Sequence, residues 1–210
     1  MKPILFNTEM VRAILEGRKT VTRRVVKPQP PATSVVRKRG CAWDWSFWSD
    51  CDMGHLMKRP YYPGDILWVR ETWNRDWCDH YIYKADGGSV KAAGYAAEPK
   101  WRPSIHMPKE AARLFLRVTD VRAERLQDIT PEQARSEGCD GRCNCPSSGA
   151  PGSLSCVERD FSIEKFESVW DSTIKPTNLH RYGWDANPWV WAIEFERVSK
   201  DEALGGGGDG

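Results

Sequence analysis

The sequence lacks any long hydrophobic run, contains only four histidines, and carries almost no excess of either charge. No stretch approaches the roughly 20 apolar residues that a membrane-spanning helix needs. The first residues, MKPILFNTEM, contain no apolar segment typical of a signal peptide. We therefore expect a cytoplasmic protein without membrane contact. Its seven cysteines are expected to be reduced, because an odd number without export argues against a disulfide framework.

Positive charge and tryptophan are both concentrated in this chain. Residues 11–40 hold nine lysines and arginines against the single Glu16, so this segment carries +8 while the whole chain carries +2. Such asymmetry favours a basic face that contacts phosphate, and a solvated loop rich in lysine and arginine is the alternative. The 11 tryptophans offer rings that either stack on bases or order a long loop by packing together.

The pattern of apolar, capping and turn residues predicts one α+β domain over residues 1–198 and a flexible tail over 199–210. In chain order we expect a helix at 7–17, strands at 19–26, 66–71, 79–86 and 113–126, helices at 130–138 and 161–174, and a strand at 187–198. Residues 28–60 and 139–157 have the composition of inserted loops, the first without regular structure. Because strands outnumber helices and do not alternate with them, we predict a mixed β-barrel flanked by helices.

The second expected helix has a complete entry signature. Thr130 stands at the N-cap, Pro131 at the first helical position and Gln133 at the capping-box position, and Gly138 ends the pattern. Glu137 therefore falls in the last turn, where a carboxylate is unfavourable against the helix dipole. This placement is a weak indication that Glu137 has a functional role.

The stretch GRKTVTRR, residues 17–24, gathers cations and hydroxyl groups at the start of the first long strand. In a strand Lys19 and Arg23 share one face, while Thr20, Thr22 and Arg24 share the other. A basic strand exposed to solvent would explain this composition. A pocket that binds an anionic or nucleobase-like ligand would explain it too.

Four segments, ILEGRKTVTRR, PGDILWVRETW, ERLQDITPEQARSEG and NPWVWAIEF, together resemble the ASCH domain of the PUA-like superfold. The form with tryptophan-rich insertions is similar to ASCH proteins encoded by phages and prophages. The resemblance covers most of residues 1–198, interrupted at 28–60 and 139–157. It implies a PUA-like barrel with a cleft that holds RNA, a nucleotide or a modified base.

The segment GRKTVT also resembles the reactive motif of small bacterial ASCH amidohydrolases, which remove the acyl group from N4-acetylcytidine. The resemblance implies that Thr22 is the nucleophile, Lys19 the proton acceptor and, through ITPEQARSE, Glu137 the proton donor. This chemistry is coherent, since a threonine hydroxyl needs a neighbouring base and a lysine serves if desolvation or nearby arginines lower its pKa.

Further side chains are expected to contact the ligand. They are Arg18, Thr20, Arg23, Arg70 and Glu71, with a purely structural pairing of the last two as the alternative. Phosphate binding by Lys19 and an ordinary strand role for Thr22 also stay open.

The chain departs from the small hydrolases in length. The segment 28–60 adds aromatic residues and the triplet RKR, which suits a polymeric ligand such as RNA better than a free nucleoside. The alternatives to hydrolysis are therefore a non-catalytic RNA or modified-base binding module and a ribonuclease. We expect no required cofactor and no catalytic metal, and leave protein partners undefined.

Four cysteines cluster within the second insertion. Cys139, Cys143, Cys145 and Cys156 could close a tetrahedral structural zinc site and order a segment that has no core of its own. The spacing lacks the paired C-x2-C units of a strong zinc motif. Free or redox-sensitive thiols are the alternative.

Overall fold

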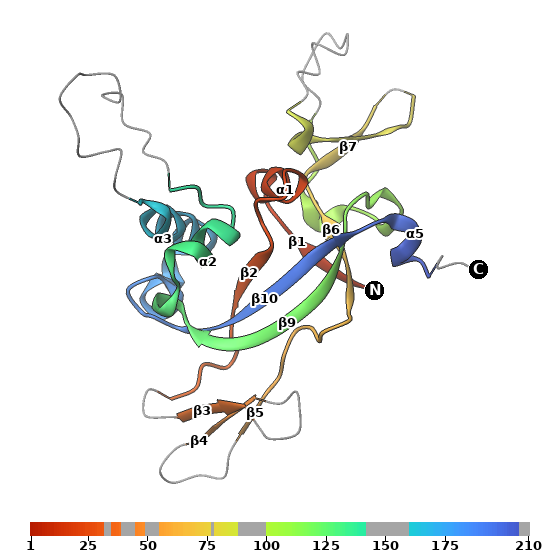
Figure 1. The fold of residues 1–210 in the computed structure, drawn as a ribbon. Helices are drawn as coiled ribbons and strands as arrows, with labels where there is room; N and C mark the ends of the chain where they lie inside the picture. Colours follow the sequence, from red (N-terminus) through yellow and green to blue (C-terminus); the bar gives the residue numbers. More distant parts are fainter. Residues whose placement is uncertain are drawn as a thin grey trace, which may run out of the picture. The chain divides into compact units, whose positions relative to one another are not determined.

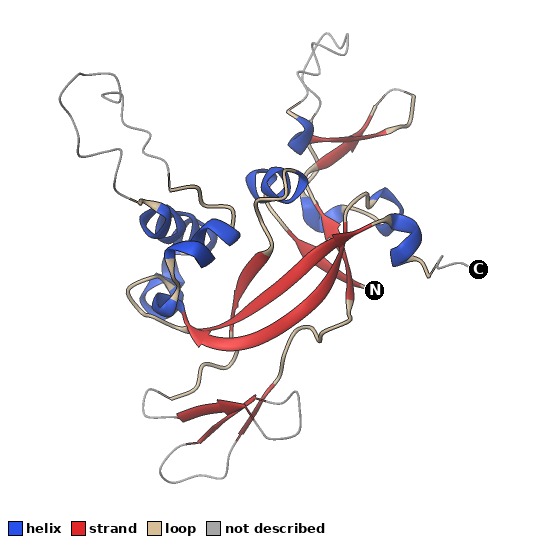
Figure 2. Ribbon diagram, in the orientation of Figure 1, coloured by secondary structure: helices blue, strands red, loops and turns tan. Residues whose placement is uncertain are grey.

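The computed structural model describes residues 1–31, 35–38, 45–48, 55–76, 78–87, 100–141 and 160–205, and for 35–38, 45–48, 55 and 56 it describes the backbone alone. Within these ranges the chain forms a mixed α+β fold, as the sequence predicts (Figures 1 and 2). None of the helices found there is both long and apolar enough to cross a membrane.

The main sheet has the strand order β1-β6-β9-β10-β2. Its strands are β1 (Lys2–Leu5), β6 (Ile66–Arg70), β9 (Phe115–Arg125), β10 (Trp189–Val198) and β2 (Val21–Val25). β1 pairs with β6 in parallel, whereas β6 with β9 and β10 with β2 pair antiparallel. The described strands thus form an open, mostly antiparallel sheet, not the closed barrel expected from the sequence. Closure would require the edge strands to pair with each other, and the hydrogen-bonded order instead ends at β1 and at β2.

Side-chain caps begin the first two helices, and the cap of the second is the one predicted from the sequence. α1 (Thr8–Leu15) is capped by the Asn7 side chain, which accepts a hydrogen bond from the Met10 backbone N–H at 2.8 Å. α2 (Pro131–Ser136) carries the complete capping box between Thr130 and Gln133. The remaining helices are α3 (Ser162–Thr173), α4 (Leu179–Tyr182) and α5 (Lys200–Ala203).

Two smaller sheets and five short 3-10 helices complete the described structure. β3 (Val35–Lys38), β4 (Trp45–Trp48) and β5 (His55–Met57) form an antiparallel sheet, and β7 (Trp73–Arg75) pairs with β8 (Tyr81–Tyr83). The 3-10 helices are η1 (Lys84–Asp86), η2 (Ser104–His106), η3 (Lys109–Ala111), η4 (Leu126–Asp128) and η6 (Pro176–Asn178). The expectation of a structureless segment at 28–60 was therefore wrong. The aromatic stretch WSFW in that segment, which forms β4, has the β-propensity of a strand.

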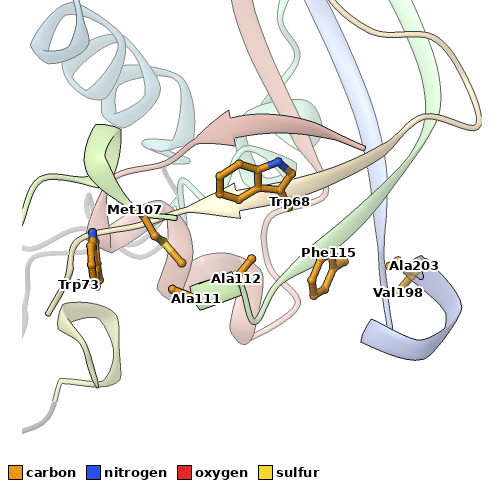
Figure 3. Packing of buried hydrophobic residues seen from close by; sticks show 8 residues of the cluster. All are labelled: Trp68, Trp73, Met107, Ala111, Ala112, Phe115, Val198 and Ala203. Carbon is orange, nitrogen blue, oxygen red and sulfur yellow. The ribbon is translucent and has the colours of Figure 1, made fainter. Parts of the chain in front are cut away.

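The chain divides into two compact units. Unit 1 comprises residues 1–20, 63–119 and 195–210, and unit 2 comprises residues 21–62 and 120–194. Unit 1 has a core of Trp68, Trp73, Met107, Ala111, Ala112, Phe115, Val198 and Ala203 (Figure 3). The core of unit 2 consists of Leu126, Ile129, Ala134, Cys139, Phe166, Trp170 and Val190.

The C-terminal segment differs from the flexible tail predicted from residue 199 onward. The Ser199 hydroxyl caps α5 by accepting from the Glu202 backbone N–H at 3.1 Å. Ala203 is buried in the core of unit 1, and Arg117 of β9 forms an ion pair with Glu202. Packing therefore continues at least to Ala203, because a short capped helix places one small apolar side chain into the core. Residues 206–210 lie outside the described residues.

Candidate functional site

The GRKTVTRR segment is not a strand exposed to solvent along its length. Lys19, Thr22 and Arg23 are only 2%, 2% and 3% exposed, whereas Arg18 and Thr20 lie in solvent. Burying a charged or hydroxyl-bearing side chain is costly unless polar partners surround it. Their burial means that part of this motif faces the interior.

A turn at Gly17 lies between α1 and β2. Gly17 adopts a left-handed conformation with φ of +74°, which a residue with a side chain rarely adopts. The backbone N–H groups of Arg18 and Lys19 then both donate to the Ala13 carbonyl, at 2.8 and 3.0 Å. Helix α1 ends within this turn, and Lys19 leaves it buried.

Arg23 is the centre of a buried polar cluster in unit 2. Its side chain has no exposed surface, and its Nε donates to Glu124 Oε1 on β9 at 2.8 Å. Its Nη1 donates to Glu137 Oε1 at 3.1 Å, and its Nη2 to Gln133 Oε1 at 3.2 Å. The guanidinium carbon lies 5.7 Å from the ring centre of Phe166 on α3. Arg23 is thus held on several sides, which a bare strand position would not require.

Helix α2 supplies two of the partners of Arg23. Gln133 Oε1 accepts from the Thr130 backbone N–H at 3.1 Å as well as from Arg23, so the capping box and the cluster share one atom. Glu137 follows the last helical residue as the C-cap, and Gly138 turns the chain away with φ of +93°. The Arg23 cation offsets the unfavourable position of a carboxylate at a helix C-terminus.

Glu137 influences both residues that follow Thr22. It accepts a hydrogen bond from Arg23, and its charge also raises the pKa of Arg24 against the larger lowering of that pKa by burial. Since successive strand residues point to opposite faces, Arg24 shares the face of Thr22. Thr22 itself is paired with Ile193 of β10. By the same alternation Thr22 points to the face of β2 opposite to Arg23. The cluster itself therefore offers the Glu137 carboxylate, and Thr22 contributes a buried hydroxyl on the other face of the strand.

Glu124 connects the cluster to further charges of unit 2. Its Oε2 accepts from Arg122 Nε at 2.9 Å, and Arg122 also forms an ion pair with Glu194 on β10. The sequence did not indicate Glu124 as part of the site, nor Gln133 as a partner of Arg23. No local signal marks Glu124, because its partner Arg23 is 101 positions away along the chain.

Lys19 belongs to unit 1. Its Nζ lies 5.7 Å from the centre of the Phe6 ring, and its side chain is almost completely buried. The predicted roles of Lys19, proton acceptor or phosphate-binding group, stay predictions.

The two predicted ligand residues at the end of β6, Arg70 and Glu71, contact other groups of the protein itself. Glu71 is 1% exposed, and Arg113 donates to both of its carboxylate oxygens, at 2.9 and 3.0 Å. Burial raises the pKa of Glu71, and the hydrogen bond from Arg113 opposes that rise. Arg70 donates to the carbonyls of Met107, at 3.2 Å, and of Ile105. Both side chains thus have structural partners, and their partners are not each other.

The cysteine prediction is only partly visible. Cys139 is 4% exposed and packs in the apolar core of unit 2, while Cys143, Cys145 and Cys156 lie outside the described residues. Across the part of the chain that is described, no group of three or more His, Cys, Asp or Glu side chains is arranged to hold a metal. The zinc hypothesis stays a prediction.

Comparisons with known proteins give a single, distant structural match. No family model matches the chain, and no curated protein sequence does. A crystal structure of protein EF3133 from Enterococcus faecalis V583, assigned to the family DUF984, aligns with 95% of this chain and 82% of its own. The identity is 11% and the TM-score 0.42.

Proposed function

We propose that this protein is a distant member of the PUA-like ASCH group that binds a cytosine-type nucleobase and hydrolyses an acyl group from its exocyclic nitrogen. The observation that carries the proposal is the buried ion pair between Arg23 and Glu137, in a strand whose preceding residue, Thr22, is also buried. A purely basic surface strand would not bury these three side chains. Buried charged groups with specific partners are concentrated at functional sites.

The proposed reaction proceeds through an acyl-threonine. Thr22 Oγ1 attacks the acyl carbonyl carbon, and the Lys19 amine accepts the hydroxyl proton. The bond between that carbon and N4 of cytosine then breaks. N4 gains the proton taken from Thr22, passed from Lys19 through Glu137, which is a carboxylate before and after this step. Water hydrolyses the ester to release a carboxylic acid and restore Thr22. Each proton transfer of this kind contributes about 10²- to 10⁴-fold to the rate.

Arg23 supports this chemistry by orienting Glu137. Its 3.1 Å hydrogen bond takes up Oε1 of Glu137. A carboxylate oxygen is also the group that recognises the exocyclic amine of cytosine. Glu137 can therefore bind N4 before the reaction and protonate it during the reaction.

The same ion pair favours a second candidate, a non-catalytic nucleobase-binding module. A carboxylate that accepts a charge-assisted hydrogen bond from Arg23 is a strong acceptor for a base N–H. In that role Glu137 need not donate a proton, and Thr22 would contribute only its shape and hydroxyl group. The two candidates predict the same ligand and differ in product formation.

Cytidine release from N4-acetylcytidine tests both candidates. We expect the wild-type protein to release cytidine, followed by chromatography, and expect Lys19→Ala and Glu137→Ala to abolish release while circular dichroism shows a folded protein. Glu132→Ala is the matched control, because Glu132 lies on the same helix but is exposed. It should keep full activity.

The remaining outcomes separate the candidates. Quenching of tryptophan fluorescence by N4-acetylcytidine without cytidine release would favour the binding module. Neither quenching nor release would overturn the proposed ligand class. Equal loss of activity in Glu132→Ala and Glu137→Ala would contradict the assigned role of Glu137.

A further inference from the structure

Three segments of unit 2 meet away from the Arg23 cluster and form a surface of cations and aromatic rings. The Val26 backbone N–H donates to the Trp189 carbonyl at 3.0 Å, and Leu126 N–H donates to the Pro188 carbonyl at 3.0 Å. The end of β2, the end of β9 and the segment before β10 are therefore neighbours. We call Lys27, Arg125, Arg181, Tyr182 and Trp189, which these segments carry, the Tyr182 surface.

Two cations of this surface flank one ring. Lys27 Nζ lies 5.5 Å from the ring centre of Tyr182, and the guanidinium carbon of Arg181 lies 5.3 Å from it. Both cations are exposed, and Tyr182 is half-buried. Arg125 stacks on the neighbouring Trp189, with 4.7 Å between the guanidinium carbon and the ring centre. Cations and rings thus alternate over a short distance along the surface.

These cations are not neutralised by acidic side chains. Among the described residues, no carboxylate lies within ion-pair distance of Lys27, Arg125 or Arg181. The exposed Asp185, three positions after Tyr182, pairs with none of the three.

Other arginines of the same unit contrast with this. Arg23, Arg122 and Arg135 each form an ion pair with at least one carboxylate. The positive charge of the Tyr182 surface is therefore available to a ligand, whereas the charge of the other three is used within the protein.

The backbone under the rings is held firmly. Trp170 Nε1 of α3 donates to the Tyr182 carbonyl at 2.8 Å. The Gln29 side chain both accepts from the Trp189 N–H and donates to the Trp189 carbonyl, at 2.8 and 2.9 Å. Because the backbone that carries the two rings is already fixed, less conformational freedom is lost when a ligand binds.

We propose that the Tyr182 surface binds the backbone of a single-stranded nucleic acid. Cations without an acidic partner among the described residues suit phosphodiesters, and the aromatic rings beside them suit unpaired bases. A base inside a duplex is already stacked and paired, so a duplex would leave the rings unused. The inference extends the proposed function from the base to the strand that carries it, and its test is independent of hydrolysis.

Salt-dependent binding tests the inference. The full-length protein is titrated into a fluorescent single-stranded RNA of about 12 nucleotides, and anisotropy is read between about 50 and about 200 mM KCl. We expect Lys27→Ala/Arg181→Ala to weaken binding about tenfold at the lower salt and to reduce the slope of log K against log[salt] by about 1.4, or roughly 0.7 for each lost phosphate contact.

Two further variants make the result specific. Lys109→Ala/Arg197→Ala removes the same charge from exposed positions of unit 1 and should leave both affinity and slope unchanged. Tyr182→Leu should weaken binding about fivefold or more with the slope preserved, because it removes stacking and no charge. Circular dichroism checks that each variant is folded.

Several outcomes would overturn the inference. These are equal losses in the two double variants, a wild-type affinity independent of salt, and equally strong binding of a duplex of the same length. Competition by cytidine monophosphate at equal concentration would also overturn it, because one phosphate would then account for the binding. Cytidine release from the free nucleoside should be the same in Lys27→Ala/Arg181→Ala as in the wild type. RNA binding without cytidine release would retain this inference and reject the hydrolase, and release without RNA binding would do the reverse.

Discussion

Arg23 Nη1 donates to Glu137 Oε1 at 3.1 Å, and this bond joins a strand residue to a helix cap 114 positions later in the chain. Both side chains are buried, at 0% and 5% exposed. The pair therefore contributes to two things at once. It determines where α2 lies against β2 within unit 2, and it orients the carboxylate that we assign to ligand recognition.

Removal of the Arg23 cation should strongly destabilise the protein. Arg23→Gln would remove the guanidinium that bridges the buried Glu137 and the half-buried Glu124, and breaking a buried ion pair typically costs about 3–5 kcal/mol. Urea denaturation measures this loss. Arg18→Gln is the control, since Arg18 pairs with Glu16 in solvent and such pairs contribute less than about 1 kcal/mol. Similar losses in both variants would contradict the structural role of Arg23.

Lys19 offers a variant that separates catalysis from folding. Methionine has nearly the same length and volume as lysine, so Lys19→Met keeps the buried space filled, and the free energy of unfolding in urea shows whether the variant is folded. Cytidine release should fall by roughly 10²-fold or more, since the base is lost. Lys84→Met, at an exposed position, should change neither quantity. Full activity in Lys19→Met would exclude Lys19 as the proton acceptor.

Gln133 Oε1 accepts hydrogen bonds from both Thr130 and Arg23, so substitutions along α2 should lower the free energy of unfolding by different amounts. Thr130→Ala removes the helix cap and should cost about 1 kcal/mol. Gln133→Ala removes its side of the capping box together with a partner of Arg23, so it should cost more. Ser136→Ala, at a half-buried position of the same helix, removes only the hydrogen bond of the hydroxyl to the Glu132 carbonyl and should cost little. Denaturation curves in which Gln133→Ala matches Ser136→Ala would show that the cluster does not depend on Gln133.

The buried Glu71 predicts a pH dependence of stability. Burial raises its pKa above the ordinary value of 4.5, so the folded state holds a proton that the unfolded state has released just above that pH. The free energy of unfolding should then fall as the pH rises through the interval above 4.5. Glu71→Gln cannot titrate and should show a shallower fall in urea denaturation. An unchanged slope in Glu71→Gln would contradict this, and Asp86→Asn controls for the second, exposed carboxylate on Arg113.

Much of the local structure could be predicted from the sequence. The Asn7 cap, the capping box of Thr130 and Gln133, and the strands around Ile66, Leu116 and Ile193 all follow from residue types within a few positions of one another. Their physical causes are local hydrogen bonds and short-range periodicity, which a sequence displays directly.

The candidate site was predictable only in part. The sequence indicated Lys19, Thr22, Arg23 and Glu137, and the resemblance to ASCH proteins assigned their roles. It did not indicate that Arg23 is fully buried or that Glu124 is its partner. Ligand contact by Arg70 and Glu71 stays a prediction, and the sequence did not indicate their partners Met107 and Arg113.

The sequence alone determined the caps, the strand periodicity and the uneven distribution of positive charge. The tertiary structure decided which charges are buried, which carboxylate meets which arginine, and whether the main sheet closes. These outcomes depend on desolvation and on contacts between residues such as Arg23 and Glu137, 114 positions apart. Such a contact contributes free energy only when both segments are packed together, so neither segment alone reveals it.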